Sequence, residues 1–150
     1  MTAIYRDYDQ AALDAQYFLR GRVADVQRYF ERWARNSAAS RERFSCRLDV
    51  AYGPSAAETL DLFLPEKSTP APILVFLHGG YWQSLDKADH SFVADGFVPH
   101  GAVVVVVNYV LAPHAGMDEI VRQIRAALAW TWRHAAEFGD AIWVKVFTTE

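Results

Sequence analysis

The sequence predicts an α/β fold, in which crossover helices cover a mainly parallel sheet. Two continuous apolar runs, ILVFL at 73–77 and AVVVVVNY at 102–109, are typical of strands that are buried on both faces. Helical patterns follow each run, around 88–98 and 117–137. Alternating strand and helix signals of this kind are typical of a parallel sheet with helical connections.

The residues before these runs predict helices and then a hairpin. A short helix is expected at 9–20, and a second one after Gly21, extending to about 39. The pattern then changes to a period of two. In RFSCRLDVAYG the apolar residues alternate with polar ones, so this stretch is expected to be a half-buried strand with one inward face, formed by Phe44, Cys46, Leu48, Val50 and Tyr52. ETLDLFLP alternates again, and GPSAAE between them is typical of a turn.

The length and composition fit one folded domain, predicted over 1–150, with a helical segment at 1–42 and a partial sheet at 43–150. Of the 150 residues, 52% are hydrophobic and 22% charged, which is ordinary for a globular chain. The net charge of −3 and the scattered arginines exclude a general attraction to nucleic acid or to anionic membranes. The polar start MTAIYRDYDQ does not read as a secretory signal, and Cys46 is the single cysteine. We therefore expect a soluble, cytoplasmic protein with neither nucleic acid nor a membrane as its partner.

The stretch His78-Gly79-Gly80-Tyr81-Trp82 directly follows the first buried strand. In open α/β sheets, ligands bind beyond the carboxyl ends of the strands. Two adjacent glycines leave backbone N–H groups that a substrate oxygen can approach, which is the chemistry of an oxyanion hole. The alternative is that the glycines only form the turn out of the strand. Tyr81 and Trp82 either wall a pocket for a flat substrate or pack under the loop.

Several longer motifs resemble the arylformamidases (kynurenine formamidases) of the α/β-hydrolase superfamily. They are HGGYWQSLDKADHSF, NYVLAP, MDEIVRQIRAALAW and the early YDQAALDAQYFLRGRV, and the resemblance covers about residues 5–138. It implies an α/β-hydrolase fold that is incomplete here. It also implies that Gly79 and Gly80 provide the oxyanion-hole N–H groups, that His78 supports the loop, and that Tyr81 and Trp82 lie beside the substrate. The implied reaction converts N-formylkynurenine to kynurenine and formate in tryptophan catabolism, with no metal or organic cofactor.

The resemblance also implies a Ser–Asp–His triad, whose serine follows the next parallel strand on a GxSxG turn. Here the predicted strand AIWVKVF at 141–147 is followed only by Thr148, Thr149 and Glu150, and the sequence contains no GxSxG. We therefore expect an amino-terminal half that is inactive by itself. A frameshift or premature stop near residue 140 is the hypothesis for this ending.

Serines elsewhere in the chain are weaker nucleophile candidates. Ser55 in GPSAA falls in the predicted hairpin turn. Ser84 and Ser91 lie near two acids and a histidine, which are Asp86, Asp89 and His90. All of these are expected to be loop or helix-cap residues. Three further histidines show no metal-binding spacing, and these are His100, His114 and His134.

Two alternative functions remain open at this point. The same glycine loop serves carboxylesterases, and a noncatalytic module would also use it to hold a carboxylate or a partner. The apolar strand at 141–147 is expected to form an exposed sheet edge, which favours dimerisation or aggregation.

Overall fold

The computed structural model describes residues 3–66, 71–138 and 144–148 of the chain. It divides the chain into two compact units, residues 1–32 and residues 33–150. Helix α1 spans Gln10–Tyr17, and the side chain of Asp9 caps it by accepting a hydrogen bond from the Ala12 N–H. The 3₁₀-helix η1 (Leu19–Arg22) and helix α2 (Val26–Arg43) follow. Among the helices of the described residues, none combines the length and apolar character that a membrane crossing requires.

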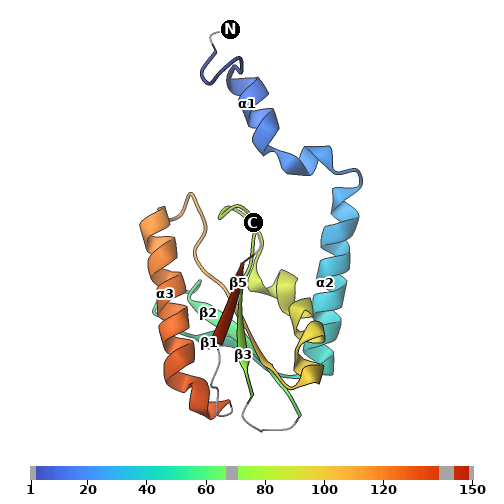
Figure 1. The fold of residues 1–150 in the computed structure, drawn as a ribbon, viewed down its shortest axis with the longest axis vertical. Helices are drawn as coiled ribbons and strands as arrows, with labels where there is room; N and C mark the ends of the chain where they lie inside the picture. Colours follow the sequence, from blue (N-terminus) through green and yellow to red (C-terminus); the bar gives the residue numbers. More distant parts are fainter. Residues whose placement is uncertain (1–2, 67–70, 139–143, 149–150) are drawn as a thin grey trace. The chain divides into compact units, whose positions relative to one another are not determined.

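The second unit contains a mixed five-stranded sheet in the order β1-β2-β4-β3-β5 (Figure 1). The β1–β2 and β2–β4 pairs are antiparallel, and the β3–β4 and β3–β5 pairs are parallel. This confirms the predicted hairpin leading into a parallel sheet. The strands are β1 (Ser45–Ala51), β2 (Thr59–Leu64), β3 (Ile73–Leu77), β4 (Val103–Val107) and β5 (Val144–Thr148). Residues 141–143 of the predicted last strand lie outside the described residues.

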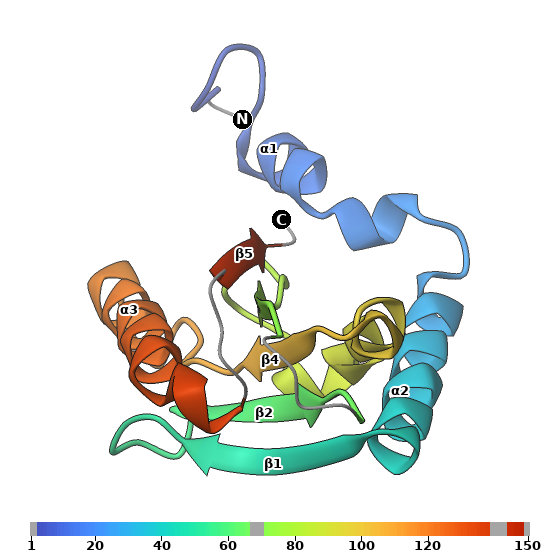
Figure 2. The ribbon, with the colours of Figure 1, turned by 60° about the horizontal axis from the view of Figure 1, so that its bottom comes forward.

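Helices cover both faces of the sheet, as the continuous apolar strands require. Helix α3 (Met117–His134) lies against one face, and the 3₁₀-helices η2 (Lys87–Gly96) and η3 (Val98–His100) lie against the other (Figure 2). All five residues of β3 and all five of β4 are buried. The connection predicted as helical around 88–98 is therefore present, but as 3₁₀-helices. The helix predicted to reach 137 ends at His134 and continues as a 3₁₀ turn, η4 (Ala135–Glu137).

The prediction that one face of β1 is uniformly apolar is wrong. A bulge between Arg47 and Val50 shifts the register against β2, and Asp49 there adopts a positive φ of 55°. Because a bulge inserts one extra residue, the residues on either side of it point to opposite faces. Phe44 and Cys46, which precede the bulge, pack on the η2 side of the sheet. Val50 and Tyr52, which follow it, pack on the α3 side, and Leu48 is exposed.

Candidate active site

The glycine pair lies where the fold predicts a ligand site, immediately after the carboxyl end of β3. Gly80 has a φ of 116°, a conformation that side chains with a Cβ rarely adopt. A Cβ on Gly80 would overlap the carbonyl oxygen of Ser84, so the loop returns too closely for any other residue. The Gly80 carbonyl accepts hydrogen bonds from the Gln83 N–H and the Ser84 hydroxyl, at 3.1 and 3.0 Å. This position therefore requires glycine for both its dihedral angle and its space.

Two hydrogen bonds fix the carbonyl groups of this loop. The Tyr109 hydroxyl donates to the His78 carbonyl at 2.5 Å, and the His78 Nδ1 lies 2.8 Å from the Gly79 carbonyl. A carbonyl oxygen only accepts, so Nδ1 carries the proton. Because a trans peptide group is planar, its N–H points opposite to its C=O. The N–H of Gly79 therefore points away from the Tyr109 hydroxyl. The N–H of Gly80 likewise points away from His78 Nδ1. Within the described part of the chain, neither N–H donates a hydrogen bond.

His78 is itself buried, with 3% of its surface exposed. Its ring stacks on Tyr109 with centroids 4.4 Å apart and 8° between the planes, and it lies 5.7 Å from the His90 ring. Its Nε2 has no hydrogen-bond partner among the described residues. Burial lowers the pKa of His78, so the ring is neutral at pH 7. A neutral, stacked imidazole with Nδ1 on the loop is suited to orienting backbone rather than to transferring a proton.

An apolar pocket of about 230 Å³ opens beside the two glycines. Its walls come from the end of β3, the glycine loop, η2 and Trp33 of α2. The lining residues are Trp33, Phe76, Gly79, Gly80, Leu85, His90, Phe92 and Val93.

Tyr81 and Trp82, predicted to lie beside the substrate, are not among these lining residues. Their side chains are 61% and 44% exposed, and their rings are tilted with centroids 5.5 Å apart. Both have a φ of 57°, and the Trp82 carbonyl accepts a hydrogen bond from the Ala112 N–H. The structure thus places them on the outer side of the loop, where contact with a ligand remains a proposal.

The serine and acid candidates near the loop have structural partners. Asp86 caps η2 by accepting from the Ala88 N–H, and Asp89 accepts from the Asp86 N–H, which together form a capping box. Ser91 is fully buried, and its hydroxyl oxygen accepts a hydrogen bond from Arg41 at 2.9 Å. The predicted helix-cap role of the two acids is confirmed.

Ser55 lies in the turn between β1 and β2, as predicted, and its N–H donates to the Glu58 carboxylate at 2.9 Å. Among the described residues, no group of three or more His, Cys, Asp and Glu side chains is arranged to hold a metal ion.

A partly buried ion-pair cluster, not predicted from the sequence, anchors the exit of the glycine loop. The Lys87 ammonium lies 2.7 Å from Asp49 and 2.8 Å from Asp61, whose side chain is only 2% exposed. Burial lowers the pKa of Lys87, but the hydrogen bonds to the two carboxylates outweigh it and raise the pKa above its ordinary value. The bulge in β1 creates this cluster, because it brings Asp49 beside Lys87. A lysine after an aspartate in a loop gives no sequence signal of burial.

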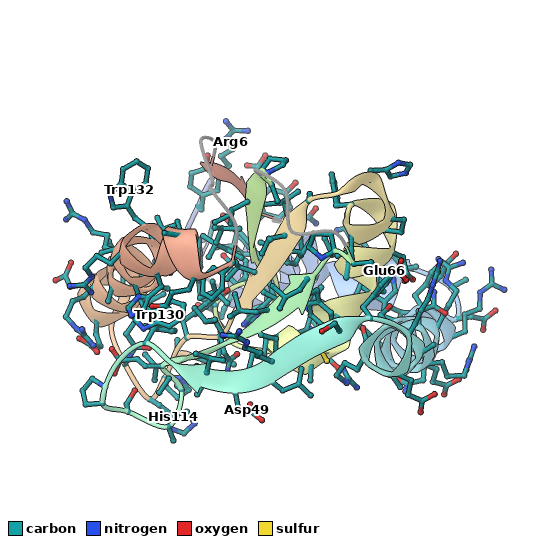
Figure 3. The ribbon with its side chains drawn as sticks, turned by 90° about the horizontal axis from the view of Figure 1, so that it is seen from below. Arg6, Asp49, Glu66, His114, Trp130 and Trp132 are labelled. Atoms are coloured by element: carbon teal, nitrogen blue, oxygen red, sulfur yellow. The ribbon has the colours of Figure 1, made fainter. Side chains whose placement is uncertain are left out.

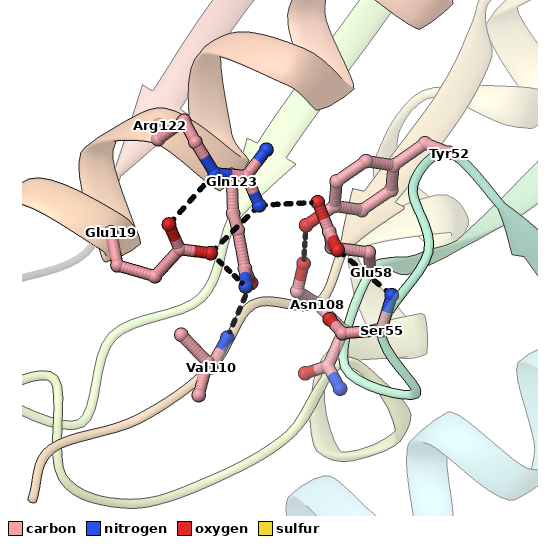
Figure 4. A network of polar contacts seen from close by, with 8 residues as sticks. All are labelled: Tyr52, Ser55, Glu58, Asn108, Val110, Glu119, Arg122 and Gln123. Carbon is pink, nitrogen blue, oxygen red and sulfur yellow. Dashed lines mark hydrogen bonds and ion pairs between the residues drawn. The ribbon is translucent and has the colours of Figure 1, made fainter. Parts of the chain in front are cut away.

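A second network connects the hairpin turn to helix α3 (Figure 4). Arg122 bridges the buried Glu58 and the exposed Glu119, at 2.7 Å each. Gln123 donates to Glu119 and accepts from the Val110 N–H at 2.9 Å. Burial raises the pKa of Glu58, but hydrogen bonds from the Ser55 backbone and from Arg122 hold it below the usual range. The network fixes the segment after β4 that carries Tyr109, the donor to the glycine loop.

Comparison with known proteins gives this geometry a family. The chain is 45% identical to a kynurenine formamidase of Danio rerio over 82 residues, which are 54% of this chain and 28% of that protein. It is 30% identical to the esterase LipC of Mycobacterium tuberculosis over 107 residues, 68% of this chain and 26% of LipC. The chain thus spans just over a quarter of the length of these relatives.

A solved structure, a provisionally named thioesterase from Silicibacter sp. TM1040, has the same fold. It superposes with a TM-score of 0.80 at 33% identity, covering 91% of this chain and 50% of that one. The fold is therefore that of part of an α/β-hydrolase, as predicted. The BD-FAE family model matches residues 60–142, a segment that contains the glycine loop, β4 and α3. With more than half of its residues matched, this chain belongs to the BD-FAE family of α/β-hydrolases.

Proposed function

We propose that this chain provides the oxyanion-hole part of a hydrolase that cleaves a formamide or an ester. The N–H groups of Gly79 and Gly80 stabilise the negative charge that develops on the carbonyl oxygen during attack. The observation that carries the proposal is the pair of fixed carbonyls, His78 held by Tyr109 and Gly79 held by His78. In this proposal His78 supports the loop, and Tyr81 and Trp82 contact the outer part of the substrate.

The favoured substrate is N-formylkynurenine, giving kynurenine and formate. Support comes from the 45% identity to the Danio rerio kynurenine formamidase over 82 residues. A carboxylesterase activity is the second candidate, since the similarity to the esterase LipC extends over a longer part of the chain. Both reactions pass through a tetrahedral oxyanion, so the same two N–H groups serve either one.

The proposed triad serine is not encoded in a GxSxG motif anywhere in these 150 residues. We propose that the chain by itself has negligible turnover, because removal of a triad serine lowers kcat by about a million-fold in a serine protease. A noncatalytic binding role is favoured by the same observation. It predicts ligand-induced stabilisation of the chain without covalent labelling by a fluorophosphonate.

A chimaera tests the catalytic proposal. Residues 1–138 are joined to the remainder of the Danio rerio kynurenine formamidase, and the product is assayed with N-formylkynurenine and with p-nitrophenyl acetate in parallel. We expect the chimaera to release formate and the 150-residue chain to release none. A folded chimaera that hydrolyses only the ester supports the carboxylesterase. Fluorophosphonate labelling of the 150-residue chain would contradict the proposal by revealing a serine within it.

We further propose a cytoplasmic location, supported by the single cysteine, Cys46, which cannot form a disulfide within the chain. The proposed association of two copies rests on β5, the outermost strand of the described sheet.

A further inference from the structure

We infer that the pocket beside Gly79 and Gly80 binds a neutral, single-ring apolar group. The identification of this group with the ring of a substrate rests on the proposed function. As a binding site, the pocket stands on its own lining. Apart from the two glycines and His90, every lining residue is apolar or aromatic, and none is Asp, Glu, Lys or Arg.

The size of the pocket suits a single ring. A protein cavity of about 150 Å³ lined by apolar side chains binds benzene. The 230 Å³ here is therefore large enough for one ring with a short substituent. The reacting carbonyl of such a ligand would lie at the mouth, where the two glycines form part of the wall.

The aromatic walls favour a ring over a flexible chain. His90 is surrounded by three other lining rings, Trp33, Phe76 and Phe92, with centroid distances of 5.9, 5.6 and 6.0 Å. Its Nδ1 lies 3.1 Å from the Asp86 carbonyl, which fixes the ring within the wall. Aromatic rings at these separations attract a further ring in an edge-to-face or offset arrangement.

The lining also excludes charge. A charged group buried in this pocket would leave water without gaining a partner from Asp, Glu, Lys or Arg, since none of these lines it. A substrate with an ionised amino-acid group must therefore keep that group outside the pocket. The pocket thus selects for the uncharged end of the ligand.

Titration of the full 150-residue chain with benzyl alcohol and with benzylammonium, followed by ligand-detected NMR at pH 7, tests this inference. The two probes have nearly the same size and differ in charge. We expect saturable binding of benzyl alcohol and at least ten-fold weaker binding of benzylammonium. Equal affinities, or no saturable binding of benzyl alcohol, would overturn the inference.

Variants locate the binding. Val93→Phe fills the pocket and is expected to weaken benzyl alcohol binding at least ten-fold. Val121→Phe adds the same atoms at an exposed position on α3, 45% accessible, and is expected to leave binding unchanged. If Val93→Phe does not fold, ¹⁵N spectra of the unmodified chain replace it. The amides of Gly79, Gly80 and Val93 must shift on binding, and shifts confined to other residues reject the site.

The result is separable from that of the chimaera. Binding of benzyl alcohol with an inactive chimaera would leave the pocket standing and reject the hydrolase proposal. An active chimaera whose parent chain binds neither probe would do the reverse.

Discussion

The hydroxyl of Tyr109 donates a hydrogen bond to the backbone carbonyl of His78, and the two rings stack with centroids 4.4 Å apart. One tyrosine thus holds the first residue of the glycine loop through both its ring and its hydroxyl. The stack positions the His78 ring, and the hydrogen bond sets the peptide group that carries the Gly79 N–H.

Tyr109→Phe separates these two contributions, because it retains the stack and removes the hydrogen bond. We expect the free energy of unfolding to fall by about 1–3 kcal/mol, since the His78 carbonyl loses its partner. In the active chimaera, kcat should fall at least ten-fold as the Gly79 N–H loses its orientation, towards the roughly 10²–10³ seen when one oxyanion donor is removed.

Tyr52→Phe is the matched control for this variant. The Tyr52 hydroxyl donates to the Asn108 carbonyl at 2.6 Å, so the substitution also removes one tyrosine–carbonyl hydrogen bond (Figure 4). We expect a similar loss of stability measured by urea unfolding, with a smaller loss of kcat, because Tyr52 does not bond to the glycine loop. Equal losses of kcat in both variants would mean that Tyr109 acts through general stability.

Gly80→Ala tests the close return of the loop. The added Cβ would collide with the Ser84 carbonyl and would also hold a φ of 116°. Gly101 has a φ of 86° but nothing within 4 Å of an added Cβ, so Gly101→Ala carries the strain of the dihedral angle alone. Left-handed strain costs about 1–2 kcal/mol. We expect Gly80→Ala to lose more stability than Gly101→Ala in urea unfolding, and equal losses would show that the loop moves to accept the methyl group.

Lys87→Met tests the partly buried ion-pair cluster. Removing the ammonium leaves Asp61 buried without a cation, and we expect a loss of about 3–5 kcal/mol in the free energy of unfolding. Arg43→Met removes an exposed pair, at 3.9 Å from Asp95, and should cost less than about 1 kcal/mol. A double variant, Lys87→Met with Asp61→Leu, should recover much of the loss, because no unpaired charge then remains buried.

The sequence predicted the parts of this fold that depend on uninterrupted apolar runs. The strands β3 and β4 needed only ILVFL and AVVVVV, since burial on both faces follows from the absence of polar positions. The glycine loop was also predictable from local sequence, because two adjacent glycines directly follow a buried strand. The Lys87 cluster was not, because it depends on a bulge that the alternation in β1 does not reveal. Likewise, nothing in the run NYVLAP distinguishes the tyrosine that holds His78.

The apolar residues of α3 differ in how far they are buried, which the sequence pattern alone does not show. Trp132 is a large apolar residue of the predicted helix, yet it is 69% exposed and projects away from the sheet (Figure 3). Ile120 and Ala127, on the same helix, are fully buried. Periodicity identifies the inward face of a helix but not how far the neighbouring elements extend around it.

The buried His78 predicts a loss of stability at mildly acidic pH. Burial holds its pKa in the folded state below the ordinary 6.5, so the unfolded chain binds the proton first. The contribution is complete above pH 6.5 and falls as the pH drops below 6.5 towards the folded-state pKa. Urea unfolding between pH 5 and 8 should show this slope. The slope should diminish in His78→Phe and persist in the control His114→Phe, which alters an exposed loop residue. A slope unaffected by His78→Phe would assign the effect to other groups.

Strand β5 predicts self-association of the chain. It is the outermost strand of the described sheet, next to β3, and its sequence VKVFT is mostly apolar. An apolar edge strand offers unpaired N–H and C=O groups to another chain. Sedimentation equilibrium should therefore show a dimer or larger species, and Val144→Lys combined with Val146→Lys should shift it towards monomer. Val121→Lys combined with Trp132→Lys, at two exposed positions on α3, serves as the charge-matched control and should leave association unchanged. A monodisperse, well-folded monomer of the unmodified chain would contradict the pairing, because the edge would then be satisfied without a second copy.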